Sequence, residues 1–135
     1  MKLTRREKLE RINSLRKGDI VWLAGLLEGE GSFQIFKDAQ GRPYCMIVMG
    51  STDLDVMQTV SSLWDSAITK SVRAGYKDYY QTNIKGSSAA ALASRLFPLM
   101  HSRRQQQISK MLQCTTVDDI NEDEIIKSIK MRLVR

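Results

Sequence analysis

The chain has 135 residues, of which 42% are hydrophobic and 27% are charged. These are the proportions of a soluble globular protein, and the length suits one domain with a core of its own. The formal net charge is +6, and residues 1–18 alone hold seven basic and two acidic side chains. A basic balance favours a polyanionic partner, either nucleic acid or an acidic membrane surface.

Several classes of protein are excluded by what the sequence lacks. Cys45 and Cys114 are too few for a disulfide framework, and no C-x-x-C pair could join His101 in a zinc site. No apolar run approaches the roughly 20 residues of a membrane span, and the basic N-terminus has no hydrophobic signal core. We therefore expect an intracellular, soluble protein without a membrane partner, in the host cytoplasm or in an organelle matrix.

The first half of the chain is expected to form two helices and a hairpin. Apolar residues at helical spacing among basic side chains predict a helix over residues 3–17, which Gly18 ends. Asp19 is the expected N-cap of a second helix over about residues 20–30. The elements expected next are a strand over Ser32–Lys37, a turn over residues 38–43 and an almost wholly apolar strand over Tyr44–Ser51.

A third helix and a second hairpin are expected next. Thr52 is the predicted cap of the helix, whose apolar stripe runs from Val56 to Trp64. Strands are expected over Lys70–Gly75 and Tyr79–Lys85, joined by a turn.

The last third of the chain is predicted to be helical. A helix over residues 87–97 precedes another, which Pro98 starts or interrupts, and Asn121 begins a final helix through a capping box. The element order predicts an α+β fold with one sheet and helices on a single face. The predicted organisation is a basic helical arm (1–18), a main domain (19–113) and a C-terminal helix extension (114–135).

The most informative segment is Leu23–Gly31, with the sequence LAGLLEGEG. Gly25 and Gly29 lie four residues apart, so they share a helix face on which a second backbone could approach closely. Each glycine costs a soluble helix roughly 1 kcal/mol relative to alanine, so their presence needs a reason. Glu30 stands where the unpaired carbonyls of the helix end gather, which favours a hard divalent cation.

These nine residues resemble the LAGLIDADG motif of homing endonucleases and related intron maturases. Two further segments resemble the family in the right order, Thr52–Met57 a "TD-x-D-V" turn and Leu96–Gln105 an "L-x-P-x-L-x-x-K-R-x-Q" stretch. The resemblance implies the LAGLIDADG homing-endonuclease fold, αββαββα with a saddle-shaped antiparallel sheet, over about residues 19–113.

The resemblance also implies a homodimer, because the motif occurs once in the chain. Two motif helices would meet along Gly25 and Gly29 and bring two copies of Glu30 together. The family implies Mg²⁺ there, bound by Glu30 and the Gly29 carbonyl beside the scissile phosphates. Each subunit would hydrolyse one DNA strand at a long pseudo-palindromic site, leaving short 3′ overhangs.

Neighbouring positions bear on whether the chain cuts DNA. The family's lysine five positions after the proline is Arg103 here, which can neutralise a phosphate but is a poor proton shuttle. Arg103 and its neighbour Arg104 could equally be solvated helix charges. The second strand should supply a polar side chain near the metal but offers mainly Met49 and Ser51. Glu28 is better explained by a structural hydrogen bond than by catalysis.

Double-stranded DNA would lie on the open face of the sheet, where glutamine, asparagine and arginine can pair with base edges. Phe36 alternatively belongs to the core. The predicted contacts are Ser32, Gln34, Phe36, Arg42, Arg73, Lys77, Gln81, Asn83 and Lys85.

Two other functions fit the same residues. One is a DNA-binding regulator without cleavage, which Arg103 and the apolar second strand favour, whereas the intact Glu30 favours the nuclease. The other is an intron maturase, the only alternative in which RNA is the partner. The basic arm either follows phosphates or lies solvated on the surface.

Overall fold

The computed structural model describes residues 3–113, so the predicted final helix at Asn121 and the extension over residues 114–135 lie outside the described residues. A four-stranded antiparallel sheet has the order β1-β2-β4-β3. The strands are β1 (Gly31–Lys37), β2 (Pro43–Ser51), β3 (Thr69–Ser71) and β4 (Tyr79–Lys85). The helices are α1 (Arg5–Asn13), α2 (Lys17–Glu30), α3 (Leu54–Trp64), α4 (Ser87–Leu96), the 3₁₀ turn η1 (Phe97–Leu99) and α5 (Ser102–Leu112).

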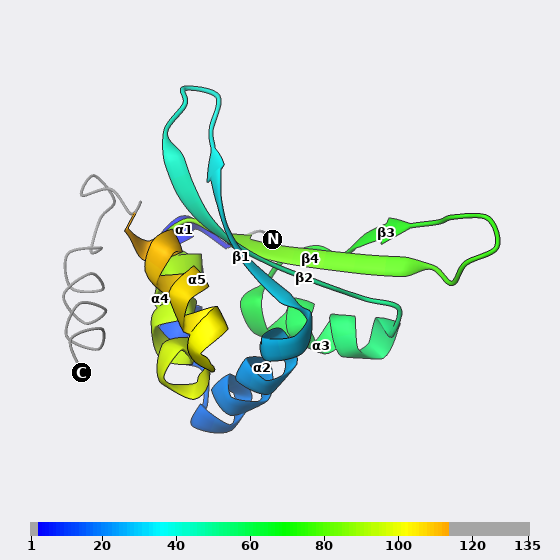
Figure 1. Ribbon diagram of the computed structural model, residues 1–135, viewed down its shortest axis with the longest axis horizontal. Helices are drawn as coiled ribbons and strands as arrows, with labels where there is room; N and C mark the ends of the chain where they lie inside the picture. Colours follow the sequence, from blue (N-terminus) through cyan, green and yellow to red (C-terminus); the bar gives the residue numbers. More distant parts are fainter. Residues whose placement is uncertain (1–2, 114–135) are drawn as a thin grey trace.

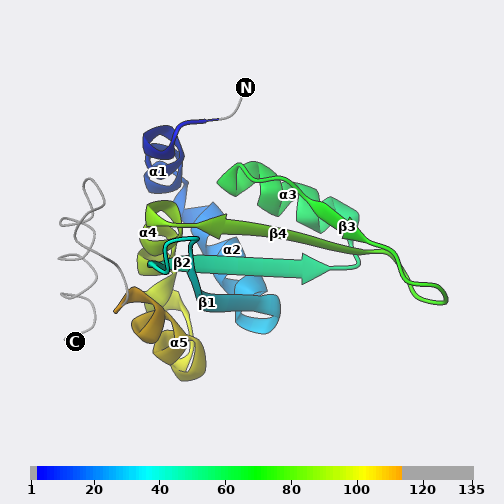
Figure 2. The same ribbon diagram turned by 90° about the horizontal axis from the view of Figure 1, so that it is seen from above.

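The helices gather on one side of the sheet, and the two hairpins project away from them in different directions (Figure 1). Seen from above, α4 lies between α1 and α5 (Figure 2). This arrangement confirms the predicted α+β fold, with one antiparallel sheet and helices on one face. Among the helices of residues 3–113, none combines the length and the apolarity that crossing a membrane requires.

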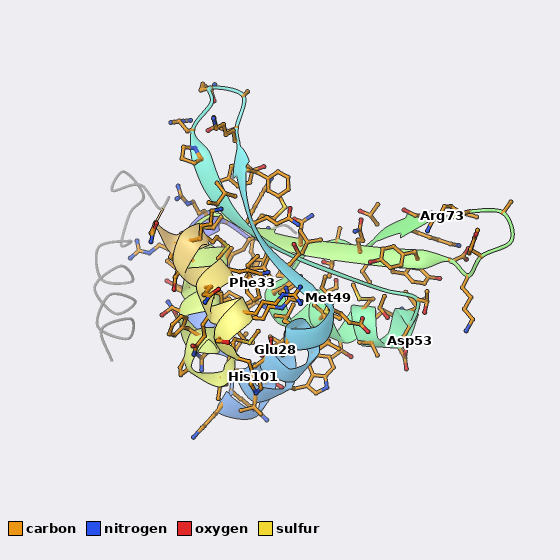
Figure 3. The ribbon with its side chains drawn as sticks, viewed as in Figure 1. Glu28, Phe33, Met49, Asp53, Arg73 and His101 are labelled. Atoms are coloured by element: carbon orange, nitrogen blue, oxygen red, sulfur yellow. The ribbon has the colours of Figure 1, made fainter. Side chains whose placement is uncertain are left out.

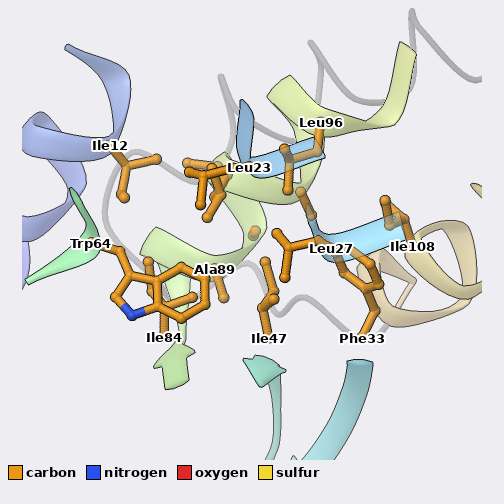
Figure 4. Close-up of a cluster of buried hydrophobic side chains, with 14 of the residues drawn as sticks. Ile12, Leu23, Leu27, Phe33, Ile47, Trp64, Ile84, Ala89, Leu96 and Ile108 are labelled. Carbon is orange, nitrogen blue, oxygen red and sulfur yellow. The ribbon is translucent and has the colours of Figure 1, made fainter. Parts of the chain in front are cut away.

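The core lies between the sheet and the helices (Figure 4). Leu23 and Leu27 of α2 are fully buried, as are Ile47 of β2 and Trp64 of α3. The indole Nε1 of Trp64 donates a hydrogen bond to the buried Thr82 hydroxyl at 3.1 Å, so the one polar atom of that large side chain is paired. Small alanine side chains along α4 allow helices to pack closely on both of its sides.

Predicted boundaries are wrong at three helices, the first of which also ends early, at Asn13 instead of residue 17. The helix α1 begins after Thr4, whose hydroxyl and backbone amide exchange hydrogen bonds with Glu7 in a capping box. The next helix starts at Lys17, so Gly18 lies inside it and Asp19 is in its first turn rather than at its N-cap. The N-cap of α3 is Asp53 instead of Thr52.

The basic N-terminal helix contributes to the core. Leu9 and Ile12 of α1 are buried, and the helix packs on α4. Arg95 of α4 donates a hydrogen bond from Nη1 to the Ile12 carbonyl at 2.8 Å. The apolar side of this segment is therefore part of the same core as the motif helix, while its basic side chains remain on the outside.

The second hairpin differs from the prediction at its third strand. The strand β3 ends at Ser71, four residues before the predicted end, and residues 72–78 form a loop. Gly75 has a φ of +81°, and the Tyr76 amide donates to the Arg73 carbonyl at 3.1 Å. Such a turn cannot continue an extended strand, which is why Arg73 lies in the loop and not on the sheet.

Candidate functional site

The motif helix α2 has one buried face and one open face. Ile20, Leu23, Ala24 and Leu27 point into the core. On the other side, Trp22 is 40% exposed, and a Cβ atom placed on Gly25 or Gly29 would have no neighbour within 4 Å. Packing inside the described part of the chain therefore does not require either glycine.

Gly31 is needed within the chain itself. A Cβ atom there would lie 2.6 Å from Leu27 Cδ2 and 2.8 Å from the Leu27 carbonyl oxygen, closer than van der Waals contact allows. The Gly31 amide donates a hydrogen bond to that carbonyl and so ends the helix. The last glycine of the motif thus lets β1 leave the helix directly after Glu30.

Glu30 is the final residue of α2, and its side chain is exposed. Within residues 3–113, the Glu30 carboxylate has neither a hydrogen bond nor an ion pair. The same described residues contain no group of three or more His, Cys, Asp or Glu side chains that could hold a metal ion. One chain therefore presents a single free carboxylate at this helix end.

Glu28 has a structural role at the same helix end. Its carboxylate faces His101 (Figure 3) and accepts hydrogen bonds from the His101 backbone amide at 2.6 Å and from Nδ1 at 2.7 Å. The backbone hydrogen bond from His101, the N-cap residue of α5, holds the pKa of Glu28 below its usual value. As predicted, Glu28 is engaged in structural hydrogen bonds, which join α2 to the start of α5.

Arg104 reinforces this junction, contrary to the alternative of a solvated charge. Its side chain is buried, and its Nε donates to the Glu28 carbonyl at 3.0 Å while Nη1 donates to Gln107. The partner in α2 lies 76 residues earlier in the chain, so no local pattern could have revealed the contact. Arg103, the residue before Arg104 on α5, is exposed and has no such contact within residues 3–113.

The hydrogen bonds of Glu28 make the free energy of unfolding depend on pH in the acid range. A carboxyl group with a lowered pKa contributes stability above its unfolded pKa, near 4.5 here, and loses it as pH falls through the folded pKa. We expect Glu28→Gln to reduce the free energy of unfolding at neutral pH and to flatten its decline between about pH 5 and pH 3. Urea titrations across this range measure the effect, with Glu10→Gln as the control. An unchanged acid dependence in Glu28→Gln would contradict the assignment.

The second strand brings no polar side chain to the outer face near the motif. Met49 pairs with Gly31 and is buried, and the Ser51 hydroxyl accepts a hydrogen bond from the Asp53 amide at 3.1 Å. Within the chain, Met49 therefore belongs to the core and Ser51 is engaged at the start of α3. Gly50, between these two residues on β2, faces the other side of the sheet. It is covered by Tyr79, whose hydroxyl would lie 2.0 Å from an added Cβ atom.

Six of the predicted DNA contacts lie on the sheet face that points away from the helices. Residues of β4 alternate between the two faces, with Thr82 and Ile84 buried and with Gln81, Asn83 and Lys85 exposed, as expected for DNA contacts on the open face. On β1, Ser32, Gln34 and Phe36 share the outer face, and Gln34 donates a hydrogen bond to the Ser32 hydroxyl.

The outer part of β1 departs from the expected division of faces. Phe36 is 38% exposed and stacks on Tyr44 with ring centroids 6.1 Å apart, so it is not a core residue. Ile35 lies two residues after the buried Phe33, so strand alternation assigns both to one face, but Ile35 is 40% exposed. The hairpin β1–β2 extends beyond the helices at this point, which leaves both of its faces open (Figure 1).

The remaining predicted contacts lie near the hairpin tips. Arg42 pairs with Asp38 in the first tip, with Nε 3.0 Å from Oδ2. Arg73 lies in the second tip (Figure 3). Its guanidinium is 5.4 Å from the centre of the Tyr76 ring, and Lys77 is exposed. All nine predicted residues therefore lie in the two hairpins, six of them on strands and three in the loops.

Comparison with known proteins gives a match in structure alone. No protein-family model and no curated protein sequence matches the chain. The homing endonuclease I-CvuI, solved with the uncleaved I-CreI target DNA in the presence of Mg, superposes with a TM-score of 0.55 and 13% identity over 88% of this chain and 83% of that one. An archaeal intron-encoded homing endonuclease, I-Vdi141I, solved in complex with DNA, gives 0.51 and 10% identity over 87% and 98%. The chain therefore has the fold of the LAGLIDADG homing endonucleases.

Proposed function

We propose that the protein is a homodimeric, Mg²⁺-dependent, sequence-specific DNA endonuclease of the homing type that acts inside the host cell. One observation carries the proposal. Glu30 is exposed and unpaired at the end of a helix whose glycine face has no contact within the described part of the chain. Within residues 3–113 nothing packs against Gly25 or Gly29 and nothing pairs with Glu30, and a second copy docked on α2 would make use of both features.

The dimer supplies what one chain lacks. A second α2 seated on Gly25 and Gly29 would bring two Glu30 carboxylates to the same place, where their charges repel unless a cation separates them. Mg²⁺ is commonly held by one or two carboxylates together with substrate phosphates. Glu30 and the Gly29 carbonyl provide ligands of this hard, oxygen-bearing kind, so the residues present fit the ion.

Cleavage would follow from the chemistry of this site. A bound Mg²⁺ lowers the pKa of water and stabilises the leaving 3′ oxygen during phosphodiester hydrolysis. Glu30 would hold the ion in place, and Arg103 would offset negative charge on the phosphate without moving a proton. Each subunit would cut one strand, which produces a double-strand break with short 3′ overhangs.

Binding of DNA would use the outer face of the sheet. The strands and loops of the two hairpins, residues 31–51 and 69–85, carry six basic and two acidic side chains, which favours a phosphate backbone. A β-ribbon fits the major groove, and Gln34, Gln81 and Asn83 have the amide groups that pair with adenine. Two subunits related by a twofold axis would read a pseudo-palindromic site. The DNA in the I-CvuI and I-Vdi141I structures supports this choice of substrate.

A DNA-binding regulator is the second candidate, because β2 supplies no polar side chain beside the motif. A direct assay separates the two functions. Duplexes selected from a randomised library by binding to the protein are cloned into a plasmid and incubated with Mg²⁺, with Mn²⁺ or with EDTA. The nuclease predicts linear plasmid only when a divalent ion is present. Specific binding without a break in either metal would establish the regulator instead.

A further inference from the structure

The middle of the proposed DNA-binding face is apolar. Because Ile47 and Met49 of β2 point into the core, the alternate residues Met46 and Val48 point outward. Both are only partly covered, and Tyr44 continues the row toward the hairpin tip. An outward methionine and valine in the central part of a sheet are not needed for the core, which lies on the other side.

Polar side chains flank this row at defined positions. In the strand register, Met46 lies between Gln34 of β1 and Lys85 of β4. Val48 lies between Ser32 and Asn83 in the same way. Each apolar residue thus has a hydrogen-bonding side chain on both of its sides, a pattern that an apolar protein surface would not match.

The major groove of B-DNA offers a matching pattern. Its edge presents hydrogen-bonding groups on every base pair, and its one apolar feature is the 5-methyl group of thymine. Gln34 and Asn83 can pair with adenine and Lys85 with guanine, while Met46 and Val48 have no group that can hydrogen-bond with a base edge.

We propose that Met46 and Val48 form a thymine-reading row, in which each side chain contacts the 5-methyl group of a thymine in the half-site. This inference rests on the proposed function, because it assumes that the sheet face binds DNA. Two residues along a strand span about 6.8 Å, and base pairs are stacked about 3.4 Å apart. Where β2 follows the groove, the two thymine contacts fall about two base pairs apart.

The thymine-reading row also bears on the kind of nucleic acid. Uracil lacks the 5-methyl group, and the major groove of an RNA helix is too narrow for side chains to reach its base edges. An apolar row on this face therefore has a matching partner in DNA and none in double-stranded RNA, which disfavours the maturase.

Uracil substitution tests the row directly. In a duplex selected by binding, each thymine is replaced in turn by deoxyuridine, which removes one methyl group and leaves base pairing intact. We expect about a fourfold loss of affinity at two positions in each half-site, the size expected for one buried methyl group. In Val48→Ala, deoxyuridine at one of these two positions should no longer reduce affinity. In Met46→Ala, deoxyuridine at the other position should no longer reduce it.

Asn83→Ala is the matched control, since Asn83 lies beside Val48 on the same face. It should weaken binding but leave the uracil penalties of the two positions unchanged, because the Asn83 amide pairs with a base edge through hydrogen bonds and takes no part in an apolar contact with a methyl group. Thermal unfolding of each variant establishes that the loss is not one of folding. Uniform uracil penalties below about 1.5-fold, or penalties that Val48→Ala and Met46→Ala leave unchanged, would overturn the row while DNA binding stands. Failure to bind any duplex would overturn the proposed function, and the row with it.

Discussion

Replacing Glu30 by glutamine is expected to lower the rate of DNA cleavage on the order of a thousandfold. The reason is that the amide keeps the size of the side chain but removes the charge that holds the cation. Affinity for DNA should stay within a few-fold of the wild type, because Glu30 lies at the helix end and not on the sheet face. Single-turnover cleavage of a saturated duplex, together with a binding titration, separates the two effects.

Glu28→Gln is the matched control, since it removes the same charge two residues away on the same helix. The Glu28 carboxylate is engaged by His101 and Arg104, so its loss should lower stability and leave most of the cleavage rate at a temperature where the variant is folded. Cleavage by Glu30→Gln at the wild-type rate would show that another group binds the metal. An equal loss in both variants would show that the charge of the helix end matters and the position of Glu30 does not.

Replacing Gly25 by alanine is expected to change folding and association in opposite directions. In a single chain the added methyl group has open space around it, so better helix propensity should raise stability by up to about 1 kcal/mol. In the proposed dimer the same methyl group lies where two backbones meet. Overpacking costs about 1–3 kcal/mol per site, and a dimer has two sites, so dimerisation should weaken by at least about thirtyfold.

Gly18→Ala provides the control on the same helix. Its position also has nothing within 4 Å, but it lies seven residues, or about 10 Å, before Gly25 along the axis. Sedimentation over a range of protein concentrations should give a dimer for the wild type and Gly18→Ala, and a monomer at low concentration for Gly25→Ala. A monomeric wild type would remove the dimer from the proposed function. A tight Gly25→Ala dimer would place the interface on another surface.

The parts of the fold that could be predicted are those with a strong local pattern. The bounds Tyr79–Lys85 and the two faces of β4 follow from strict alternation, and the stripe of α3 follows from helical spacing. Leu23–Gly31 indicated the family fold and placed the Glu30 carboxylate at the end of a helix. In each case the relevant residues are neighbours in the sequence, so periodicity and motif alone contain the information.

The errors arose where distant contacts or backbone geometry decide. Arg73 was expected on a strand, but the turn at Gly75 ends the pairing at Ser71. Ile35 has the parity of a core residue and is exposed, because the helices do not extend beneath that part of the hairpin. Local alternation assigns a residue to a face of the sheet, whereas only the tertiary structure determines whether anything covers that face.

The sequence by itself determined the α+β class, the single motif helix with its two glycines, and the carboxylate at its end. Only the tertiary structure decided that the glycine face is open, that Glu28 is bound by α5 while Glu30 is not, and that Met46 and Val48 lie together between polar neighbours. The physical reason is the same in all three cases. Helix and strand patterns depend on residues a few positions apart, but exposure, pairing and strand register depend on which distant segments the folded chain brings together.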